Sequence, residues 1–288
     1  MKISDILSQK STTVSCELFP PKAGGDLAQM EQVVRPIAAL KPDFISVTYG
    51  AAGGTSKNTL EVARMVQSCG VSSIAHLTCV SSTREDIRER LEGLARAGIQ
   101  NILALRGDLP ADGDFPSPLN YRYASELVRE IRADGRFCIG GACYPEGHVE
   151  SDSREKDMDR LKEKAEAGCD FLTSQMFFDN DVFYNFLYHI LARDIRIPVI
   201  AGIMPVTNAR QVRRITQLSG AALPLRFRMI LDRYGENPAA MKQAGIAYAT
   251  EQIIDLIANG VRGIHIYTMN KPDIATGIIE NLSAVLGR

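Results

Sequence analysis

The chain has 288 residues, of which 45% are hydrophobic and 23% are charged, the mixture of a folded globular protein. Its 33 Lys and Arg residues nearly balance its 34 Asp and Glu residues, which argues against a nucleic-acid-binding protein, since such proteins need surplus positive charge to neutralise phosphates. No apolar run approaches the roughly 20 residues that span a bilayer, and the opening MKISDILSQK contains no secretory signal. We therefore expect a cytoplasmic protein.

Eight short runs rich in β-branched and apolar residues predict buried strands. They read as continuously apolar rather than alternating, which is typical of parallel strands covered on both faces. The predicted strands are Thr13–Leu18, Phe44–Thr48, Ser73–Cys79, Asn101–Leu105, Phe137–Cys143, Phe171–Gln175, Pro198–Ile203 and Gly263–Thr268.

Amphipathic segments of helical period separate the strands. Thr83, with Asp86 three residues later, predicts the start of one helix, and Gly98 predicts its end. The predicted helices are Asp26–Leu40, Lys57–Ser68, Thr83–Ala97, Tyr123–Ala133, Ser153–Ala167, Asp181–Arg193, Ala209–Leu218, two within Ala221–Gly260, and Asp273–Leu286.

This alternation predicts an α/β fold, a (β/α)8 TIM barrel with one or two extra helices before the last strand. The typical length of about 250 residues for that fold leaves room for these helices in a single domain spanning residues 1–288. An open doubly wound sheet is the alternative, but such sheets usually have five or six strands.

The six cysteines contain no C-x-x-C pair, so neither a zinc ribbon nor a thioredoxin-type site is indicated. We expect reduced cysteines that behave as small hydrophobic residues. They are Cys16, Cys69, Cys79, Cys138, Cys143 and Cys169.

Polar side chains gather where the predicted strands end, which is where barrel enzymes build their active sites. Each of these residues alone is also explained by a salt bridge or a satisfied core position. Together, on one rim, they indicate a shared cavity for a polar ligand. They include Glu17, Thr48, His76, Arg106, Asp108, Tyr144, His148, Gln175 and Tyr267.

Several kinds of site find little support in the sequence. No H-x-H on the first strand and no H-E-x-x-H helix supports a metal, although Glu17, His76, Asp108 and His148 could meet in principle. No lysine in a predicted strand supports a Schiff base, and no G-x-G-x-x-G loop supports a Rossmann nucleotide site. The Gly140-Gly141 pair instead leaves room for a flat ring at the barrel mouth.

Eight segments in order along the chain resemble the methylenetetrahydrofolate reductase family. They are Ser15–Lys22 (SCELFPPK), Val47–Ala51 (VTYGA), His76–Cys79 (HLTC), Ala104–Pro110 (ALRGDLP), Tyr144–His148 (YPEGH), Ser174–Asp179 (SQMFFD), Gly202–Val206 (GIMPV) and Ile266–Asn270 (IYTMN).

The resemblance implies a flavin enzyme that reduces 5,10-methylenetetrahydrofolate to 5-methyltetrahydrofolate. FAD, rather than FMN, takes hydride from NADH or NADPH in this family and then passes it to the folate in a ping-pong sequence. Some relatives receive electrons from a partner subunit instead, and homo-oligomers are common.

The resemblance also assigns catalytic and folate-binding roles. Glu17 matches the acid that opens the folate imidazolidine ring, and a carboxyl group at the barrel mouth can supply that proton. Asp108 matches the acidic residue beside the flavin. Gln175 matches an amide shared by folate and nicotinamide, Gln211 a second folate contact, and Lys271 stands where Arg is typical.

Flavin contacts carried over by position come mainly from the middle of the chain. They are Thr48, His76, Arg106, Gly107, Asp108, Tyr123, Ala124, Tyr144 and His148, with Asp157, Arg160 and Lys164 near the ribose and diphosphate. The chain departs from the family pattern at Arg160 and Glu163, where Asn and Arg are usual, and at Ile215, where an aromatic often stacks on the ligand.

Two other functions would also place polar residues on a barrel rim. One is a flavin-free lyase or aldolase, and the other is a barrel that binds folate without catalysis. A flavin spectrum, and its response to donor and folate, distinguish these possibilities from the reductase.

Overall fold

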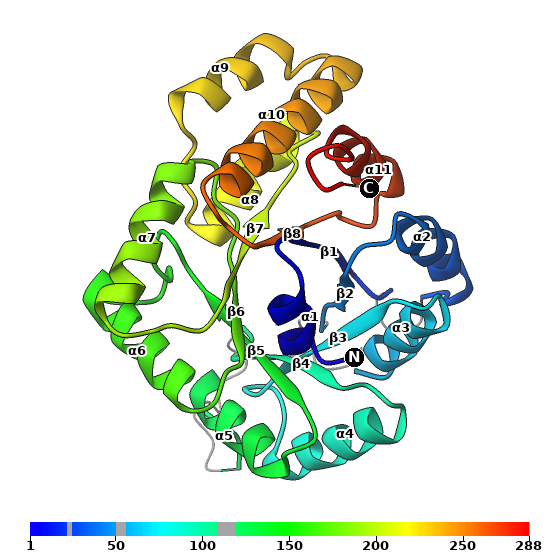
Figure 1. The fold of residues 1–288 in the computed structure, drawn as a ribbon, viewed down its shortest axis with the longest axis vertical. Coiled ribbons are helices and arrows are strands. Elements are labelled where there is room, and N and C mark those ends of the chain that lie inside the picture. The colour runs from blue at the N-terminus through cyan, green and yellow to red at the C-terminus, as the bar shows by residue number, and fades with distance from the viewer. Residues whose placement is uncertain (22–24, 50–55, 109–118, 288) are drawn as a thin grey trace.

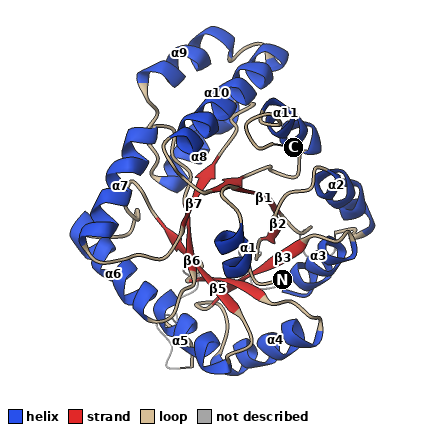
Figure 2. Cartoon of the chain, in the orientation of Figure 1, coloured by secondary structure: helices blue, strands red, loops and turns tan. Residues whose placement is uncertain are grey.

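A computed structural model describes residues 1–21, 25–49, 56–108 and 119–287, and it confirms the predicted (β/α)8 barrel. Eight parallel strands close in the order β1 to β8, with β1 paired to β8 (Figure 1). Figure 2 shows the strands as an inner ring surrounded by helices. The strands are β1 (Thr13–Leu18), β2 (Phe44–Val47), β3 (Ser72–Thr78), β4 (Asn101–Leu105), β5 (Cys138–Cys143), β6 (Phe171–Ser174), β7 (Val199–Ile203) and β8 (Gly263–Ile266).

The helices lie where the amphipathic segments predicted them, with one addition at the N-terminus. Thr83 and Asp86 form the predicted capping box, in which each side chain bonds the backbone N–H of the other residue. The helices are α1 (Ile3–Gln9), α2 (Ala28–Ala39), α3 (Ser56–Ser68), α4 (Arg84–Arg96), α5 (Ala124–Asp134), α6 (Arg154–Glu166), α7 (Asn180–Ala192), α8 (Ala209–Ser219), α9 (Leu225–Tyr234), α10 (Pro238–Ala258) and α11 (Pro272–Asn281).

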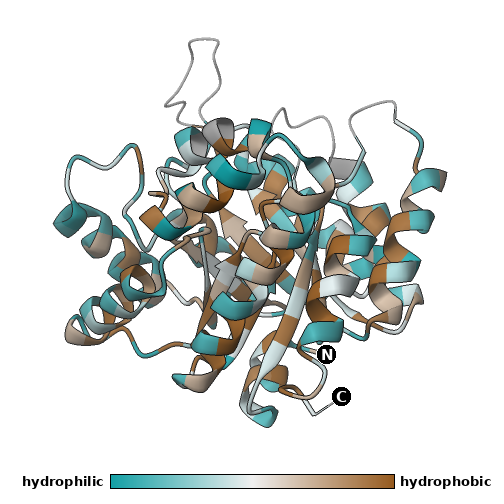
Figure 3. Ribbon diagram, turned by 90° about the horizontal axis from the view of Figure 1, so that it is seen from above, coloured by the Kyte–Doolittle hydropathy of each residue, from teal (hydrophilic) through white to brown (hydrophobic). Residues whose placement is uncertain are grey.

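The outer faces of the strands form the main core against the helices. In the side view of Figure 3, hydrophilic and hydrophobic residues alternate along the outer helices, as amphipathic helices require. Among the described helices, none combines the length and apolar composition needed to cross a bilayer. All six cysteines are unpaired thiols, and burial raises the pKa of Cys16 and Cys143 to about 12.

The prediction that every strand is continuously apolar is wrong for β1. Val14, Cys16 and Leu18 lie in the outer core, whereas Ser15 and Glu17 contact polar residues inside the barrel. The strand therefore alternates, and its inward face is polar because it borders the site rather than the packed end of the barrel.

Helix α1 closes the amino end of the barrel and was not predicted. Its Ile3, Ile6 and Leu7 pack with residues near the starts of the strands, including Phe44 and Phe171. Figure 1 shows α1 in front of the centre of the ring. The opposite end, where the strands terminate, is thereby the end at which a ligand can reach the barrel interior.

Candidate active site

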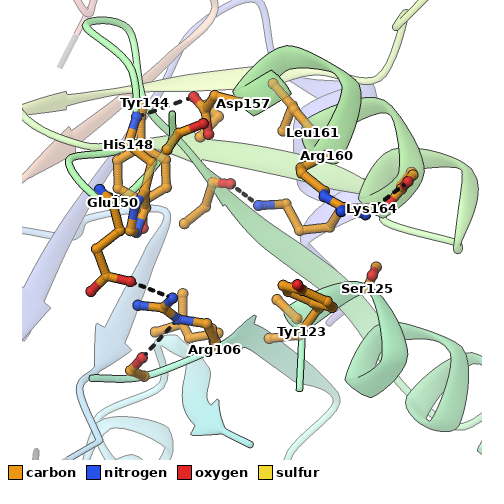
Figure 4. Close-up of a pocket in the computed structure, with 18 of the residues that line it drawn as sticks. Arg106, Tyr123, Ser125, Tyr144, His148, Glu150, Asp157, Arg160, Leu161 and Lys164 are labelled. Atoms are coloured by element: carbon orange, nitrogen blue, oxygen red, sulfur yellow. Dashed lines mark hydrogen bonds and ion pairs between the residues drawn. The ribbon is translucent and has the colours of Figure 1, made fainter. Parts of the chain in front are cut away.

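A cavity of about 750 Å³ lies at the carboxyl ends of β3, β4 and β5, against the start of α5 and one face of α6 (Figure 4). Cavities of about 300–1,000 Å³ are usual for small molecules and cofactors. Its walls are formed by Tyr49, Thr78, Ser81, Ala104, Leu105, Arg106, Gly107, Asp108, Tyr123, Ala124, Ser125, Ala142, Cys143, Tyr144, His148, Glu150, Ser151, Asp152, Lys156, Asp157, Asp159, Arg160, Leu161, Glu163 and Lys164.

Most of the residues expected to contact a cofactor line this cavity. Of the predicted cofactor residues, all except Thr48 and His76 belong to its walls. They come from the ends of two strands, β4 and β5, and from two helices, α5 and α6, so their meeting depends on the fold of the barrel rather than on any local motif. Tyr49, Ser125 and Glu150 also line the cavity without having been predicted.

One face of α6 lines the cavity and brings the Lys164 ammonium to it. Asp157, Arg160, Leu161 and Lys164 recur at helical spacing, so they share that face. The Lys164 ammonium donates a hydrogen bond to the carbonyl oxygen of Ala142 at the end of β5. This bond holds a cation at the point where the strand enters the cavity.

The unusual pair on α6 is neutralised within the helix. Arg160 Nη1 lies 2.9 Å from the Glu163 carboxylate, and the same guanidinium lies 5.0 Å from the centre of the Tyr123 ring. Glu163 therefore does not face the cavity as an unpaired negative charge. Figure 4 shows Arg160 lying beside Lys164 and across from Tyr123.

His148 is held at the cavity wall through its backbone and its ring. Its backbone N–H donates a hydrogen bond to Asp157 Oδ2 (3.2 Å). Its ring packs edge-on against the Tyr144 ring, with 4.6 Å between the ring centroids. Burial lowers the pKa of His148, which favours the neutral ring. Nδ1 accepts a bond from the Glu150 N–H (3.1 Å), so the neutral ring carries its proton on Nε2.

Arg106 is tied to Glu150, which follows β5. Its Nη1 lies 2.5 Å from Glu150 Oε2, and its Nε donates to the Gly107 carbonyl at 3.2 Å. The hydrogen bond from Arg106 lowers the pKa of Glu150, so this pair stays charged at neutral pH. The sequence offered no signal for this pair because its members are 44 residues apart.

Gly107 allows the backbone to approach β3 closely. Its φ is +86°, and a Cβ atom there would lie 2.9 Å from the Thr78 Cβ. Both the left-handed conformation and the close contact require glycine. This part of the cavity wall is therefore bare backbone.

A second polar group lies inside the barrel, around Glu17. Glu17 Oε2 lies 3.6 Å from His76 Nε2 and 3.7 Å from His265 Nε2, and all three side chains are buried. His265 is held by Ser15 on β1 (2.8 Å to Nδ1) and Ser46 on β2 (3.3 Å to Nε2). His265 was not predicted as a site residue, although it lies two residues before Tyr267 and its ring contacts the Tyr267 ring (5.2 Å between ring centroids).

Burial controls the charge of His76. Desolvation lowers its pKa to about 4, outweighing the opposing attraction of Glu17. The imidazole is therefore neutral at pH 7, and its Nε2 has no hydrogen-bond partner within the described ranges. A buried unpaired nitrogen beside a carboxyl group marks this as a place where a polar ligand would be satisfied.

The remaining predicted site residues lie outside the large cavity. Gln211 and Lys271 line a much smaller pocket of about 10 Å³ beside β7 and β8, together with Ile215. The amide oxygen of Gln175 accepts a bond from the Met176 N–H (2.9 Å), and Thr48 follows β2. In the part of the chain that the structure describes, no group of three or more His, Cys, Asp or Glu residues could hold a metal.

A family model described as methylenetetrahydrofolate reductase matches residues 2–283. The chain belongs to the methylenetetrahydrofolate reductase family. It is therefore an oxidoreductase of folate one-carbon metabolism, and the resemblance seen in its eight segments is confirmed.

Curated relatives support this membership across nearly the whole chain. The 5,10-methylenetetrahydrofolate reductase of Pectobacterium carotovorum is 32% identical over 95% of this chain and 91% of its own length. The 5,10-methylenetetrahydrofolate reductase of Escherichia coli K12 is 31% identical over 95% of this chain and 92% of its own length. Methylenetetrahydrofolate reductase (NADH) 1 of Arabidopsis thaliana is 34% identical over 99% of this chain, which spans 50% of that longer protein.

A solved structure supports the fold alone. A Clostridium thermocellum protein that binds two copies of 5-methyl-5,6,7,8-tetrahydrofolic acid aligns with a TM-score of 0.70 at 16% identity, over 100% of this chain and 99% of that one. The likeness agrees with the barrel and its closed strand order.

Proposed function

We propose that this protein reduces 5,10-methylenetetrahydrofolate to 5-methyltetrahydrofolate with FAD bound in the large cavity. The whole chain would form a single flavin-binding domain. The observation that carries the proposal is that all predicted cofactor residues except Thr48 and His76 line one cavity of about 750 Å³. NADH or NADPH is the donor that we propose, and a partner subunit is the alternative source of electrons. Homologous enzymes named for this reaction support the choice of substrate.

The cationic and N–H groups that line the cavity suit a flavin dinucleotide. Lys164 provides a cation that suits a diphosphate, with the Arg160 guanidinium, paired to Glu163, beside it, and the start of α5 at Ala124 provides backbone N–H groups. The bare backbone at Gly107 lets a flat ring lie close to the ends of β3 and β4. When bound, FAD would take hydride from the donor and pass it to the folate.

We assign to Glu17 the proton that opens the folate ring. Protonation of an imidazolidine nitrogen allows the adjacent C–N bond to break, with its electron pair going to that nitrogen and leaving an iminium carbon for hydride. Glu17 lies at the carboxyl end of β1 with two imidazoles nearby. Because His76 stays neutral at pH 7, it does not hold the carboxyl group in a permanent ion pair.

The other roles follow from charge and placement. Asp108, exposed at the end of β4 and in the cavity wall, would disfavour negative charge on a reduced flavin and favour a folate cation. Gln175, Gln211 and Lys271 lie toward β6, β7 and β8, where we place the folate. An amide serves both a pterin and a nicotinamide, and a lysine attracts the folate carboxylates.

The purified protein tests this proposal directly. We expect a yellow protein whose released cofactor is FAD, whose absorbance bleaches anaerobically with NADH or NADPH, and whose colour returns with methylenetetrahydrofolate. A folded, colourless protein would favour a flavin-free lyase. A flavin that bleaches but is not re-oxidised by the folate would indicate a binding protein without this activity.

A further inference from the structure

The segment after β8 holds the backbone that follows Glu17. The Asn270 side-chain amide donates to the carbonyl oxygen of Phe19 (2.8 Å), and its amide oxygen accepts from the Phe19 N–H (2.9 Å). The Thr268 hydroxyl donates to the carbonyl oxygen of Glu17 itself (2.6 Å). Three side-chain bonds thus link this segment to two residues of the β1 end.

These bonds begin where the strand ladder stops. The register between β1 and β8 ends at Cys16 opposite Ile266, one residue before Glu17. Beyond that pair, Thr268 and Asn270 continue the connection between the two chain segments through side chains. Since a carboxamide offers both a donor and an acceptor, Asn270 satisfies both backbone groups of Phe19 at once.

The backbone of this segment is strained. Met269 and Asn270 have φ values of 53° and 57°, in the left-handed region that costs non-glycine residues free energy. Lys41 and Asp194 also adopt this conformation, but they precede β2 and β7 at the opposite end of the barrel. Two consecutive left-handed residues beside the proposed acid turn the Asn270 amide toward Phe19.

We propose that Asn270 is a positioning residue that fixes the direction of the Glu17 carboxyl group toward the folate. It acts through Phe19 and the β1 end and needs no contact with the substrate. The inference rests on the proposed function, because it needs Glu17 to protonate the folate. Misplacement of a reacting group by about 1 Å can lower a rate by about 100-fold. Loss of the bonds that fix this short segment should therefore slow folate reduction measurably.

Two substitutions separate the hydrogen bonds from the strain. Asn270→Gly removes both bonds to Phe19 and relieves the left-handed conformation, whereas Asn270→Ala removes the same bonds and keeps the strain. Asp194→Gly is the matched control, since it relieves a left-handed residue far from the site. Each variant is assayed anaerobically for flavin reduction by the donor, for flavin re-oxidation by methylenetetrahydrofolate, and for thermal stability.

We expect both Asn270 variants to slow re-oxidation by the folate about 10- to 100-fold while donor oxidation stays within about twofold of the unsubstituted protein. Asn270→Ala should be less stable than Asn270→Gly but equally slow with folate. Re-oxidation within twofold for Asn270→Gly, or a parallel loss in both half-reactions, would overturn the inference. If the unsubstituted protein itself fails to reduce the folate, the proposed function fails, and the inference with it.

Discussion

The carboxyl group of Glu17 and the imidazole of His76 meet inside the barrel mouth, with Oε2 3.6 Å from Nε2. Both residues are about 94% buried, and burial keeps the imidazole neutral by lowering its pKa to about 4. The acid therefore has a polar but uncharged neighbour. A neutral imidazole does not form a charged pair with the Glu17 carboxyl group, which agrees with the proposed role of Glu17 as the acid.

His76 makes the stability of the protein depend on pH in a defined window. Its pKa is about 4 in the folded protein against an ordinary 6.5, so the unfolded chain binds more protons between these values. The contribution of His76 to the free energy of unfolding is fully present above pH 6.5. It decreases as the pH falls toward 4, by about 3 kcal/mol in total. Urea unfolding at several pH values from 7 to 4 measures this loss.

His76→Gln should flatten that pH dependence, because glutamine does not titrate. His189→Gln, which removes an exposed histidine on α7, should leave it unchanged. Equal pH slopes for the unsubstituted protein and the His76 variant would show that the imidazole is not buried in its neutral form.

Gly107 and Gly70 form a matched pair for the cavity wall. Both have positive φ (86° and 80°), but a Cβ at Gly107 would lie 2.9 Å from Thr78, whereas at Gly70 it would meet nothing within 4 Å. Gly70→Ala should cost about 1 kcal/mol from conformation alone. Gly107→Ala should cost more and reduce the flavin retained, because the new methyl group forces the wall to move.

Thermal unfolding and the ratio of flavin to protein measure both effects. Equal stability losses in the two alanine variants, with flavin fully retained, would mean that the backbone at Gly107 does not approach the ligand.

Asp108 is expected to set the reduction potential of the bound flavin. Asp108→Asn removes a negative charge from the cavity wall, so the potential should rise and re-oxidation by the folate should slow about tenfold. Asp232→Asn, on the exposed face of α9, is the control. A redox titration with stopped-flow kinetics tests the prediction, and an unchanged potential in the Asp108 variant would contradict it.

Lys164 and Lys162 lie on the same helix, but only Lys164 lines the cavity. Lys164→Met should weaken flavin binding about tenfold, because a charge-assisted bond to the diphosphate is lost. Lys162→Met should leave the affinity unchanged. Titration of the flavin-free protein with FAD distinguishes the two, and equal affinities would place the diphosphate elsewhere.

The sequence predicted the barrel well because its signals are local. Each strand is a short apolar run, and Thr83 with Asp86 marks a helix start that the structure confirms. Helix α1 was missed because it has only seven residues and no side-chain cap. Short helices are marginal alone, and this one is held by Ile3 and Leu7 packing on the barrel and by the bond from the Ile3 N–H to Asn101.

The candidate site was predicted less completely, since much of it depends on contacts between distant segments. Placing polar residues at strand ends identified Glu17 and Arg106, but nothing local links Arg106 with Glu150 or Glu17 with His265. The sequence also suggested one shared cavity. The structure instead shows a large cavity over β3 to β5 and a separate small pocket that contains Gln211 and Lys271. The two are separate because the strand ends form a ring, and β7 and β8 lie on a different part of that ring from β3 to β5.

We propose that Glu17 supplies the proton for folate reduction beside a bound flavin. Glu17→Gln keeps the size and polarity of the side chain but removes its acidity, so the most direct measurement compares the two half-reactions of this variant anaerobically. We predict normal flavin content, donor oxidation within about twofold, and re-oxidation by methylenetetrahydrofolate slowed at least about 100-fold. Folate reduction at the unsubstituted rate would contradict the account.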